Sequence, residues 1–324
     1  MGLTRGNTEI IRVFTNRTLN ASALNSINEG FPIGEGFRRL ILKLYYSVTI
    51  GTGTTPISEG ELSILKGLSI RTSRGWIPFN NVPGRALWYL DAIQQRTLNL
   101  KTAVAAATAI YPVQYNLWFS DPFMMRPDDT ILDTSMLSRI QMDLNLGGVA
   151  DFFTTVGTSS VIITADLYAE RIRGRLPDKI RPKEYRETSC PAPVNPANVT
   201  ELNLERSENQ AYKRILMHAA NSATAGTPFS GTSADTTIAA MGVDSDAGEM
   251  FNKINWGVLN GITKQDRGLE TMPTGWAIFE FCNDKSKMSA ILGGLYSRLR
   301  VFWDNGTLST SQVSCLTDCM RRIA

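Results

Sequence analysis

The stretch from Gly36 to Thr52 has the clearest alternation of hydrophobic and polar positions in the chain. Its even-numbered positions are apolar, namely Leu40, Leu42, Leu44, Tyr46, Val48 and Ile50. The odd-numbered positions between them include Arg39, Lys43, Ser47 and Thr49. A period of two residues is typical of a strand with one buried and one exposed face. The pattern therefore predicts a long β-strand here.

A second segment, Ala211 to Thr227, matches this strand without a gap at an offset of 175 residues, so that Arg39 meets Arg214 and Gly51 meets Gly226. Three weaker matches follow in the same order. They join 115–119 to 277–281 (offset 162), 138–144 to 297–303 (offset 159) and 158–166 to 310–318 (offset 152). Ordered, decreasing offsets are expected of a duplicated domain whose loops have been shortened. We predict one fold written twice, with Leu40 and Ile215 on equivalent strands.

The second repeat is less apolar on the face that matches the inner face of the first. There Leu44, Tyr46, Val48 and Ile50 are replaced by Ala219, Asn221, Ala223 and Ala225. We therefore expect its far half to be thinly packed or covered by another subunit, so that the second repeat depends more on its neighbours.

Short strands and frequent turns make up most of the remaining pattern, as in a β-sandwich. Predicted strands are 7–14, 68–71, 76–79, 113–119, 139–146 and 160–169, and apolar residues at helical spacing predict one helix in 81–99 and another in 247–261. Five prolines and no periodicity favour an extended connector near 174–200. The fold class is all-β, with a first sandwich in 1–172, a proline-rich connector in 173–199, a second sandwich in 200–324 and short inserted helices.

Composition excludes some classes of function but does not identify one. The 324 residues are 43% hydrophobic and 19% charged, which fits a folded protein, and a net charge of +3 gives no electrostatic case for a dedicated nucleic-acid binder. The first residues have no signal-peptide pattern, and the least polar run, 102–113, is too short for a membrane helix. We expect a protein made and kept in a cytoplasm.

Candidate catalytic residues are few. His218 is the only histidine, and we interpret it as a histidine on the exposed face of its strand, because a catalytic base needs a third group to hold it. Asp128, Asp129 and Asp133 could pair carboxylates for acid-base chemistry, although turn and capping roles explain them as well.

Metal and ligand sites are equally weak. Asp244, Asp246 and Glu249 match part of a calcium loop, but Gly248 stands where a ligand is needed, and capping of a following helix explains the acids. The tryptophans Trp88, Trp118, Trp256, Trp276 and Trp303 fit core packing better than a sugar-stacking platform. Cys190, Cys282, Cys315 and Cys319 have no metal-binding spacing and are expected to be free and mostly buried. We predict no catalytic, metal or cofactor-binding residue, no cofactor, and no enzyme.

Two tandem β-sandwiches, each with an inserted helix, joined by a proline-rich connector, resemble the double-jelly-roll major capsid proteins of tailless icosahedral viruses, particularly lipid-containing bacterial viruses. The resemblance covers nearly the whole chain and rests on architecture and length. It implies a homotrimer that forms a pseudo-hexagonal capsomer of an icosahedral virion, assembled in the host cytoplasm. The implied partners are neighbouring capsomers, minor capsid or vertex proteins and, as in many members, an internal membrane, with no specific nucleic acid.

On that resemblance, small and threonine-rich segments such as 102–109 and 222–235 would form towers or subunit contacts. The basic residues Arg5, Arg12, Arg17, Arg321 and Arg322 would face lipid headgroups. Two alternatives stay open. One is a secreted double-jelly-roll amidase that removes glycans from asparagine, and the other is a carbohydrate-binding attachment protein.

Overall fold

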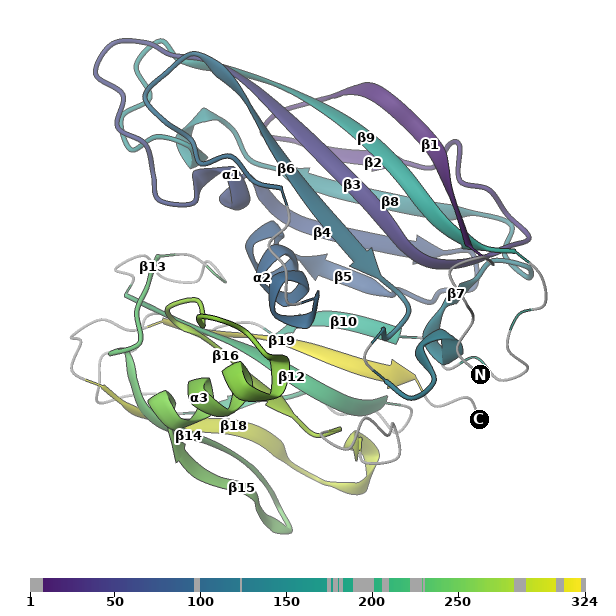
Figure 1. Cartoon of the computed structure of the whole chain (residues 1–324), viewed down its shortest axis with the longest axis vertical. Helices are drawn as coiled ribbons and strands as arrows, with labels where there is room; N and C mark the ends of the chain where they lie inside the picture. The colour runs from purple at the N-terminus through teal and green to yellow at the C-terminus, as the bar shows by residue number, and fades with distance from the viewer. Residues whose placement is uncertain are drawn as a thin grey trace. The chain divides into compact units, whose positions relative to one another are not determined.

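The chain divides into two compact units, Met1–Lys183 and Glu184–Ala324. The computed structural model describes residues 8–95, 100–122, 124–173, 176, 180, 183–188, 201–205, 210–221, 229, 231–282, 290–306 and 312–321. Both units are built mainly from antiparallel strands (Figure 1). The segment 173–199, predicted to be an extended connector, contains the strand β10 (Lys183–Thr188).

The first unit has two sheets. One has the order β1 (Thr8–Leu19), β9 (Ser160–Ile172), β3 (Gly36–Thr49) and β6 (Ala109–Trp118), and β7 (Leu132–Asp133) also pairs with β3. The other contains β5 (Phe79–Val82), β4 (Leu65–Thr72), β8 (Ile140–Leu146) and β2 (Leu24–Ile27) as successive neighbours. Two helices, α1 (Gly60–Ser63) and α2 (Gly84–Gln95), lie in the connections between strands.

The predicted alternation of β3 is confirmed. Leu40, Leu42, Leu44 and Tyr46 are fully buried, while the residues between them are half-buried. The strand ends at Thr49, so Ile50 lies outside it. Burial of the even-numbered side chains removes a continuous apolar stripe from water, and this fixes the register because a shift of one residue would expose the whole stripe.

The second unit repeats this plan. One sheet has the order β13 (Thr232–Ser233), β12 (Gln210–Asn221), β19 (Gln312–Arg321) and β10, while β16 (Trp276–Glu280) and β17 (Ile291–Leu292) also pair with β12. The other sheet has the order β11 (Glu201–Asn203), β18 (Leu299–Asn305), β14 (Ile238–Ser245) and β15 (Gly248–Asn255). The helix α3 (Trp256–Arg267) follows β15 directly.

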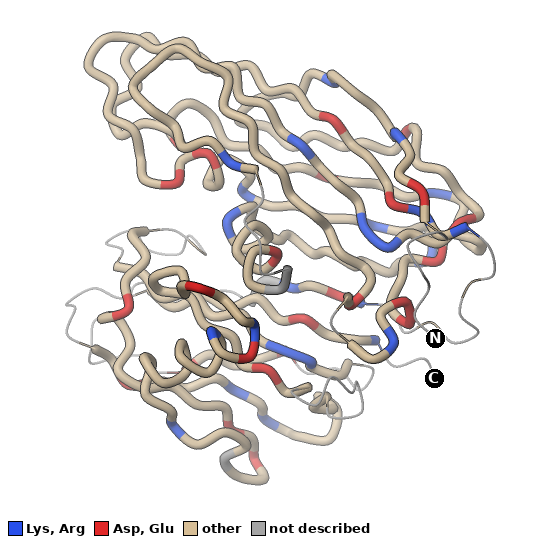
Figure 2. Tube along the Cα trace, in the orientation of Figure 1, with Lys and Arg blue, Asp and Glu red and all other residues tan. Residues whose placement is uncertain are grey.

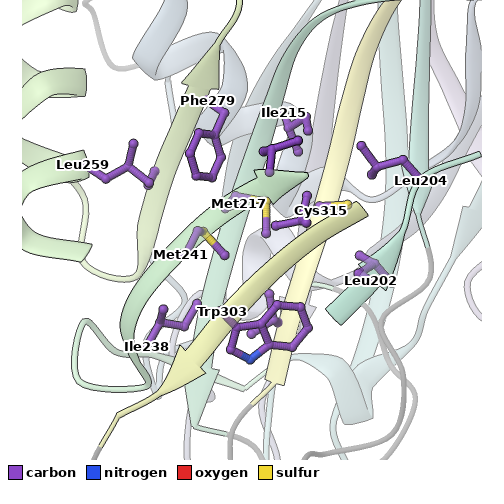
Figure 3. Packing of buried hydrophobic residues seen from close by; sticks show 14 of the residues in the cluster. Leu202, Leu204, Ile215, Met217, Ile238, Met241, Leu259, Phe279, Trp303 and Cys315 are labelled. Carbon is purple, nitrogen blue, oxygen red and sulfur yellow. The ribbon is translucent and has the colours of Figure 1, made fainter. Parts of the chain in front are cut away.

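The core of the second unit lies between its two sheets (Figure 3). Ile215, Met217 and Phe279 come from one sheet, Met241 and Trp303 come from the other, and all five are buried. Helix α3 adds Leu259 to the same cluster. Aligned sheets that interdigitate their inner side chains in this way form the core of a β-sandwich.

The helix α3 begins and ends at recognisable caps. The side chain of Asn255 accepts a hydrogen bond from the Gly257 amide at 3.0 Å, and Gly268 ends the helix in the left-handed conformation with φ of 58°. Each cap satisfies backbone groups that the helix leaves without partners. The helix predicted in 247–261 is therefore wrong in its first half, where Met250, Phe251 and Ile254 lie on β15. The helix predicted in 81–99 is observed as α2.

Strand pairing shows that the two units have equivalent elements. β3 pairs with β9, β6 and β7, and β12 pairs with β19, β16 and β17. Arg39 lies opposite Trp118 and Arg214 lies opposite Glu280, which confirms the predicted offsets of 175 and 162 together. Leu40 and Ile215 are therefore on equivalent strands, as expected.

The last predicted match is wrong by four residues. Arg39 pairs with Glu170 and Arg214 pairs with Asp318, so β9 corresponds to β19 at an offset of 148 rather than 152. Both strand ladders also have a register shift at equivalent points, between Phe37 and Arg39 in one and between Tyr212 and Arg214 in the other. This agreement supports the corrected offset. The match at an offset of 152 aligned similar residue types, but the aligned residues do not occupy equivalent positions in the two strand ladders.

Candidate functional site

A set of charged side chains from β12, β19, β16 and α3 is buried in the second unit, and we call it the buried ion network. Its members are Lys213, Arg214, Arg267, Glu280 and Asp318. Lys213 Nζ lies 3.1 Å from Asp318 Oδ1, and Arg214 Nε lies 3.3 Å from Asp318 Oδ2. The side chains of these three residues are at most 2% exposed.

Glu280 joins the network to the helix. Its Oε2 atom lies 3.3 Å from Arg214 Nε and also accepts a hydrogen bond from Arg267 on α3. Each carboxylate thus faces two cations, which compensates part of the cost of removing charge from water. Such a network links three strands and a helix, and its carboxylates are held by cations instead of being directed at a substrate.

The first unit has a more exposed counterpart at the equivalent positions. Arg39 forms an ion pair with Glu170 at 2.6 Å, with side-chain exposures of 23% and 13%. The neighbouring Arg38 binds both oxygens of Asp128 at 2.8 Å. Arg38 corresponds to Lys213, and their carbonyl groups accept from Phe119 and Phe281 at 2.8 and 2.9 Å. Both units therefore place a cation at the same backbone irregularity, which twists the strand locally.

His218 is buried, so the prediction of a histidine on an exposed strand face is wrong. Its ring centroid lies 4.4 Å from that of Trp276 and 5.9 Å from that of Phe229. His218 Nε2 is 3.0 Å from Ser233 Oγ. The face of β12 that was predicted to be exposed is itself covered, which explains the error.

The acidic segment 244–249 forms a β-hairpin and does not cap a helix. Asp244 binds Arg300 through two hydrogen bonds of 2.7 Å, and Asp246 accepts from the amide of Ser297 at 3.0 Å. Gly248, with φ of 122°, closes the turn between β14 and β15. The side chain of Glu249 lies outside the described residues. Among the residues that the structure describes, no group of three acidic, cysteine or histidine side chains is placed to hold a metal ion.

The three aspartates of the first unit have separate roles. Asp128 is held by Arg38, and Asp133 accepts a hydrogen bond from the Ser135 amide at 2.8 Å, as expected of a turn residue. Asp129 lies beside Asp128 in the short 3-10 helix Pro127–Thr130. An engaged Asp128 does not favour the paired-carboxylate hypothesis.

Four of the five tryptophans are core residues, as predicted: Trp88, Trp256, Trp276 and Trp303 are at most 3% exposed. Trp118 differs, because it is half-buried and points its indole Nε1 at Asp91 Oδ1 of α2, 2.7 Å away. The guanidinium group of Arg39 lies 4.5 Å from its ring centroid. Trp118 therefore belongs to the face of the sheet opposite the core.

The described cysteines Cys282, Cys315 and Cys319 are buried and form no disulfide, which confirms the prediction for these three. Burial raises the pKa of the Cys282 thiol to about 12. Such thiols stay protonated near neutral pH and are poor nucleophiles. Cys190 lies outside the described residues.

One polar cluster was missed by sequence reasoning. Glu59, in the left-handed conformation before α1, accepts from Arg85 Nε at 2.8 Å, from Lys101 Nζ at 3.1 Å and from the hydroxyl of Tyr89. Burial alone would raise the pKa of Glu59, but Arg85, Tyr89 and Lys101 outweigh it and hold the pKa below its usual value. No motif signals this cluster, because its residues are up to 42 positions apart.

Two cavities in the described part of the chain have linings that do not suit a glycan. One of about 100 Å³ lies beside α3 and is lined mainly by apolar side chains such as Phe251, Ile254 and Ile262. The other, of about 320 Å³, is lined by Arg171 and Arg173, whose charges are paired with Glu9. Ligand pockets are typically about 300–1,000 Å³ and keep polar groups available for the ligand.

Comparison with known proteins gave matches at the level of structure alone. No protein-family model and no curated protein matched the sequence. The major capsid protein P2 of bacteriophage PM2 is 15% identical, with a TM-score of 0.66 over 98% of both chains. The major capsid protein of Sulfolobus turreted icosahedral virus is 14% identical, with a TM-score of 0.72 over 97% of both chains. The capsid protein of the PBCV-1 virus is 11% identical, with a TM-score of 0.62 over 97% of this chain and 94% of the other.

The chain has the double-jelly-roll fold. The two jelly rolls are the two units described above, and the all-β prediction with short inserted helices is confirmed. Within the described part of the double jelly roll, no helix is long and apolar enough to cross a membrane.

Proposed function

We propose that this double jelly roll is the major capsid protein of an icosahedral virus. The observation that carries the proposal is the coverage: solved capsid proteins match 97–98% of this chain, and the PM2 protein is itself covered over 98%. The shared part is therefore the whole chain and not one domain of it. The function is structural, and the protein is not an enzyme.

The contacts of the polar side chains support this proposal. Asp128, Asp244 and Asp318 each face an arginine or lysine, and His218 lies among aromatic rings. A hydrolase needs a base and a nucleophile within reach of a substrate pocket. Charged side chains that pair with one another do not form such a site, and they make the subunit of a shell rigid.

The finer assembly is part of the same proposal. Three copies form a pseudo-hexagonal capsomer, because each copy supplies two similar jelly rolls, and the capsomers tile a shell together with minor capsid or vertex proteins. Assembly takes place in the host cytoplasm of a bacterium. The chain recognises no specific nucleic acid, in keeping with its net charge of +3.

An internal membrane is the proposed neighbour of the basic termini. Arg12 on β1 and Arg321 at the end of β19 are exposed. Each basic residue near an anionic lipid surface contributes about 1 kcal/mol. Replacing Arg12, Arg17 and Arg321 by glutamine should release the isolated capsomer from vesicles that contain phosphatidylserine, and unchanged binding would contradict the membrane role.

Native mass spectrometry and light scattering test the capsid function. The expected result is a stable species of three times the chain mass of 35.7 kDa, or a shell-sized particle seen by electron microscopy. A monomer that releases or binds asparagine-linked glycans would overturn the proposal in favour of the amidase or attachment protein.

A further inference from the structure

One face of the first jelly roll carries well-exposed isoleucines. This outer face is the side of the sheet β1, β9, β3 and β6 that is opposite Leu40 and the core, and the four strands lie side by side in Figure 1. Ser47 on β3 pairs with Ile110 on one side and with Ile162 on the other. These two isoleucines are 62% and 60% exposed, and Ile10, opposite Glu170 toward the other end of the face, is 57% exposed.

The charges that β3 and β9 place on the outer face are already paired, whereas the exposed Arg12 of β1 lies on this face opposite Tyr168. Arg39 binds Glu170 at 2.6 Å, and Asp166 accepts from the Tyr45 hydroxyl at 3.0 Å. Lys43 lies 4.9 Å from the centroid of the Tyr45 ring. Strand β6 carries no charged residue and is tan along its whole length in Figure 2. A partner would therefore cover mostly apolar, aromatic and neutralised groups, as in the centre of protein interfaces.

The outer face can supply a large part of an interface. Four strands about 4.8 Å apart, with about ten residues each at about 3.3 Å per residue, span roughly 600 Å² before the unevenness of the side chains is counted. Helix α2 covers one end of β6, where Asn116 and Trp118 bind Asp91. A stable interface buries about 800 Å² on each partner, so the uncovered part of this face can supply a substantial share of one contact.

The second jelly roll shows that the equivalent face becomes buried. Ile41 and Tyr168, which pair on the outer face, are half-buried. Their equivalents Leu216 and Leu316 also pair with each other, but are 0% and 1% exposed. At this pair of positions the face is fully covered in the second repeat and only half-covered in the first.

We propose that the outer face of the first jelly roll binds a second copy of this chain. The inference rests on the proposed capsid function, and it assigns the subunit contact to the β1–β9–β3–β6 face with Ile110 and Ile162 among its central apolar groups. The partner is a second copy of the chain, because in a closed ring of identical chains each copy binds the next through the same pair of surfaces. The open face of every copy is then covered by a surface of its neighbour.

The test replaces Ile110 and Ile162 together by lysine in the full chain, with Leu24→Lys/Met136→Lys as the matched control. The control residues are 64% and 65% exposed and lie off the outer face, so the added charge is the same and the exposure is similar. Analytical ultracentrifugation should show that the trimer of the first variant dissociates at a concentration at least tenfold higher than wild type, while the control stays trimeric. If both double variants assemble alike, whether as trimers or as monomers, the inference is wrong.

A cysteine variant keeps the test decisive if the lysine variant fails to fold. Ile162→Cys should react with a maleimide at least tenfold more slowly in the trimer than Leu24→Cys, after subtraction of the wild-type reaction. Equal rates would overturn the assignment of the face. A wild-type chain that is monomeric would overturn the capsid proposal itself, whereas a wild-type trimer together with a fast-reacting Ile162→Cys variant would overturn the face assignment alone.

Discussion

Asp318→Asn tests whether the buried ion network holds the second jelly roll together. The substitution keeps the shape of the side chain and removes the charge that faces Lys213 and Arg214. Both cations are at most 2% exposed, so water cannot replace the lost carboxylate. Breaking a buried pair by removing one partner costs about 3–5 kcal/mol, because it leaves a buried charge without compensation.

The repeat supplies a matched control. Glu170→Gln removes the equivalent carboxylate from β9, where Arg39 is 23% exposed and can be solvated after the change. Partly exposed ion pairs contribute about 0–1 kcal/mol. The two substitutions alter equivalent positions on equivalent strands, and they differ mainly in burial. We therefore expect a difference in the free energy of unfolding of at least about 2 kcal/mol.

Urea unfolding followed by circular dichroism measures this difference. With a slope of about 2 kcal/mol per molar urea, Asp318→Asn should lower the midpoint of the second-unit transition by about 2 M. Hydrogen exchange of β12 peptides should assign the loss to this unit. Adding Lys213→Met should recover part of the stability, since it removes a buried cation that has lost its ion pair with Asp318. An Asp318→Asn variant no less stable than Glu170→Gln would refute the reasoning.

Three further predictions concern other parts of the fold. Because the pKa of Glu59 is lowered in the folded protein, its carboxylate stabilises the fold above the unfolded pKa of about 4.3, and this contribution is lost as the pH falls through the lower folded value. The difference in melting temperature between wild type and Glu59→Gln should be constant from about pH 7 to about pH 5 and narrow below it. Gly261→Ala on α3 should raise the free energy of unfolding by about 0.5–1 kcal/mol, because the added methyl group meets no other atom. Gly306→Ala should lower it, because the methyl group would collide with the carbonyl of Thr236. Thermal melts of both variants check the two signs. Cys282 should react with iodoacetamide at about pH 8 more than a hundredfold more slowly than a free thiol, because burial raises its pKa to about 12; mass spectrometry of the intact protein measures the rate.

The sequence reveals strands whose two faces differ in exposure. β3 was predicted from its period of two because only one of its faces is buried. In β12 the same period is lost, since residues 210–220 are buried on both sides, and its position came from the match to β3 instead. Where both faces are covered, burial no longer distinguishes odd from even positions, and β12 buries Lys213, Arg214 and His218 as well as its apolar residues, so the alternation disappears.

Short apolar runs and distant contacts are harder to infer. Met250, Phe251 and Ile254 fit helical spacing, yet they lie on β15, because a few apolar residues satisfy either period. The partners in the pairs Arg39–Glu170 and Arg214–Asp318 are far apart in the chain, and no local pattern joins them. Strand pairing alone brings these side chains together, so the ion network could not be predicted from the sequence.

The structure tests one part of an expectation about assembly. The second repeat is expected to be thinly packed from Ala219 onward on its inner face, but Ala219 itself is buried in the core, Asn221 is exposed, and residues 222–228 lie outside the described residues. The exposed isoleucines lie on the first jelly roll, on the strands that match those covered in the second. A small side chain on a buried strand indicates that the neighbouring element approaches closely. It does not by itself indicate an uncovered face. The apolar face that needs a partner is therefore found by comparing exposure between equivalent strands, which points to β6, β3 and β9 as the surface through which one copy meets the next.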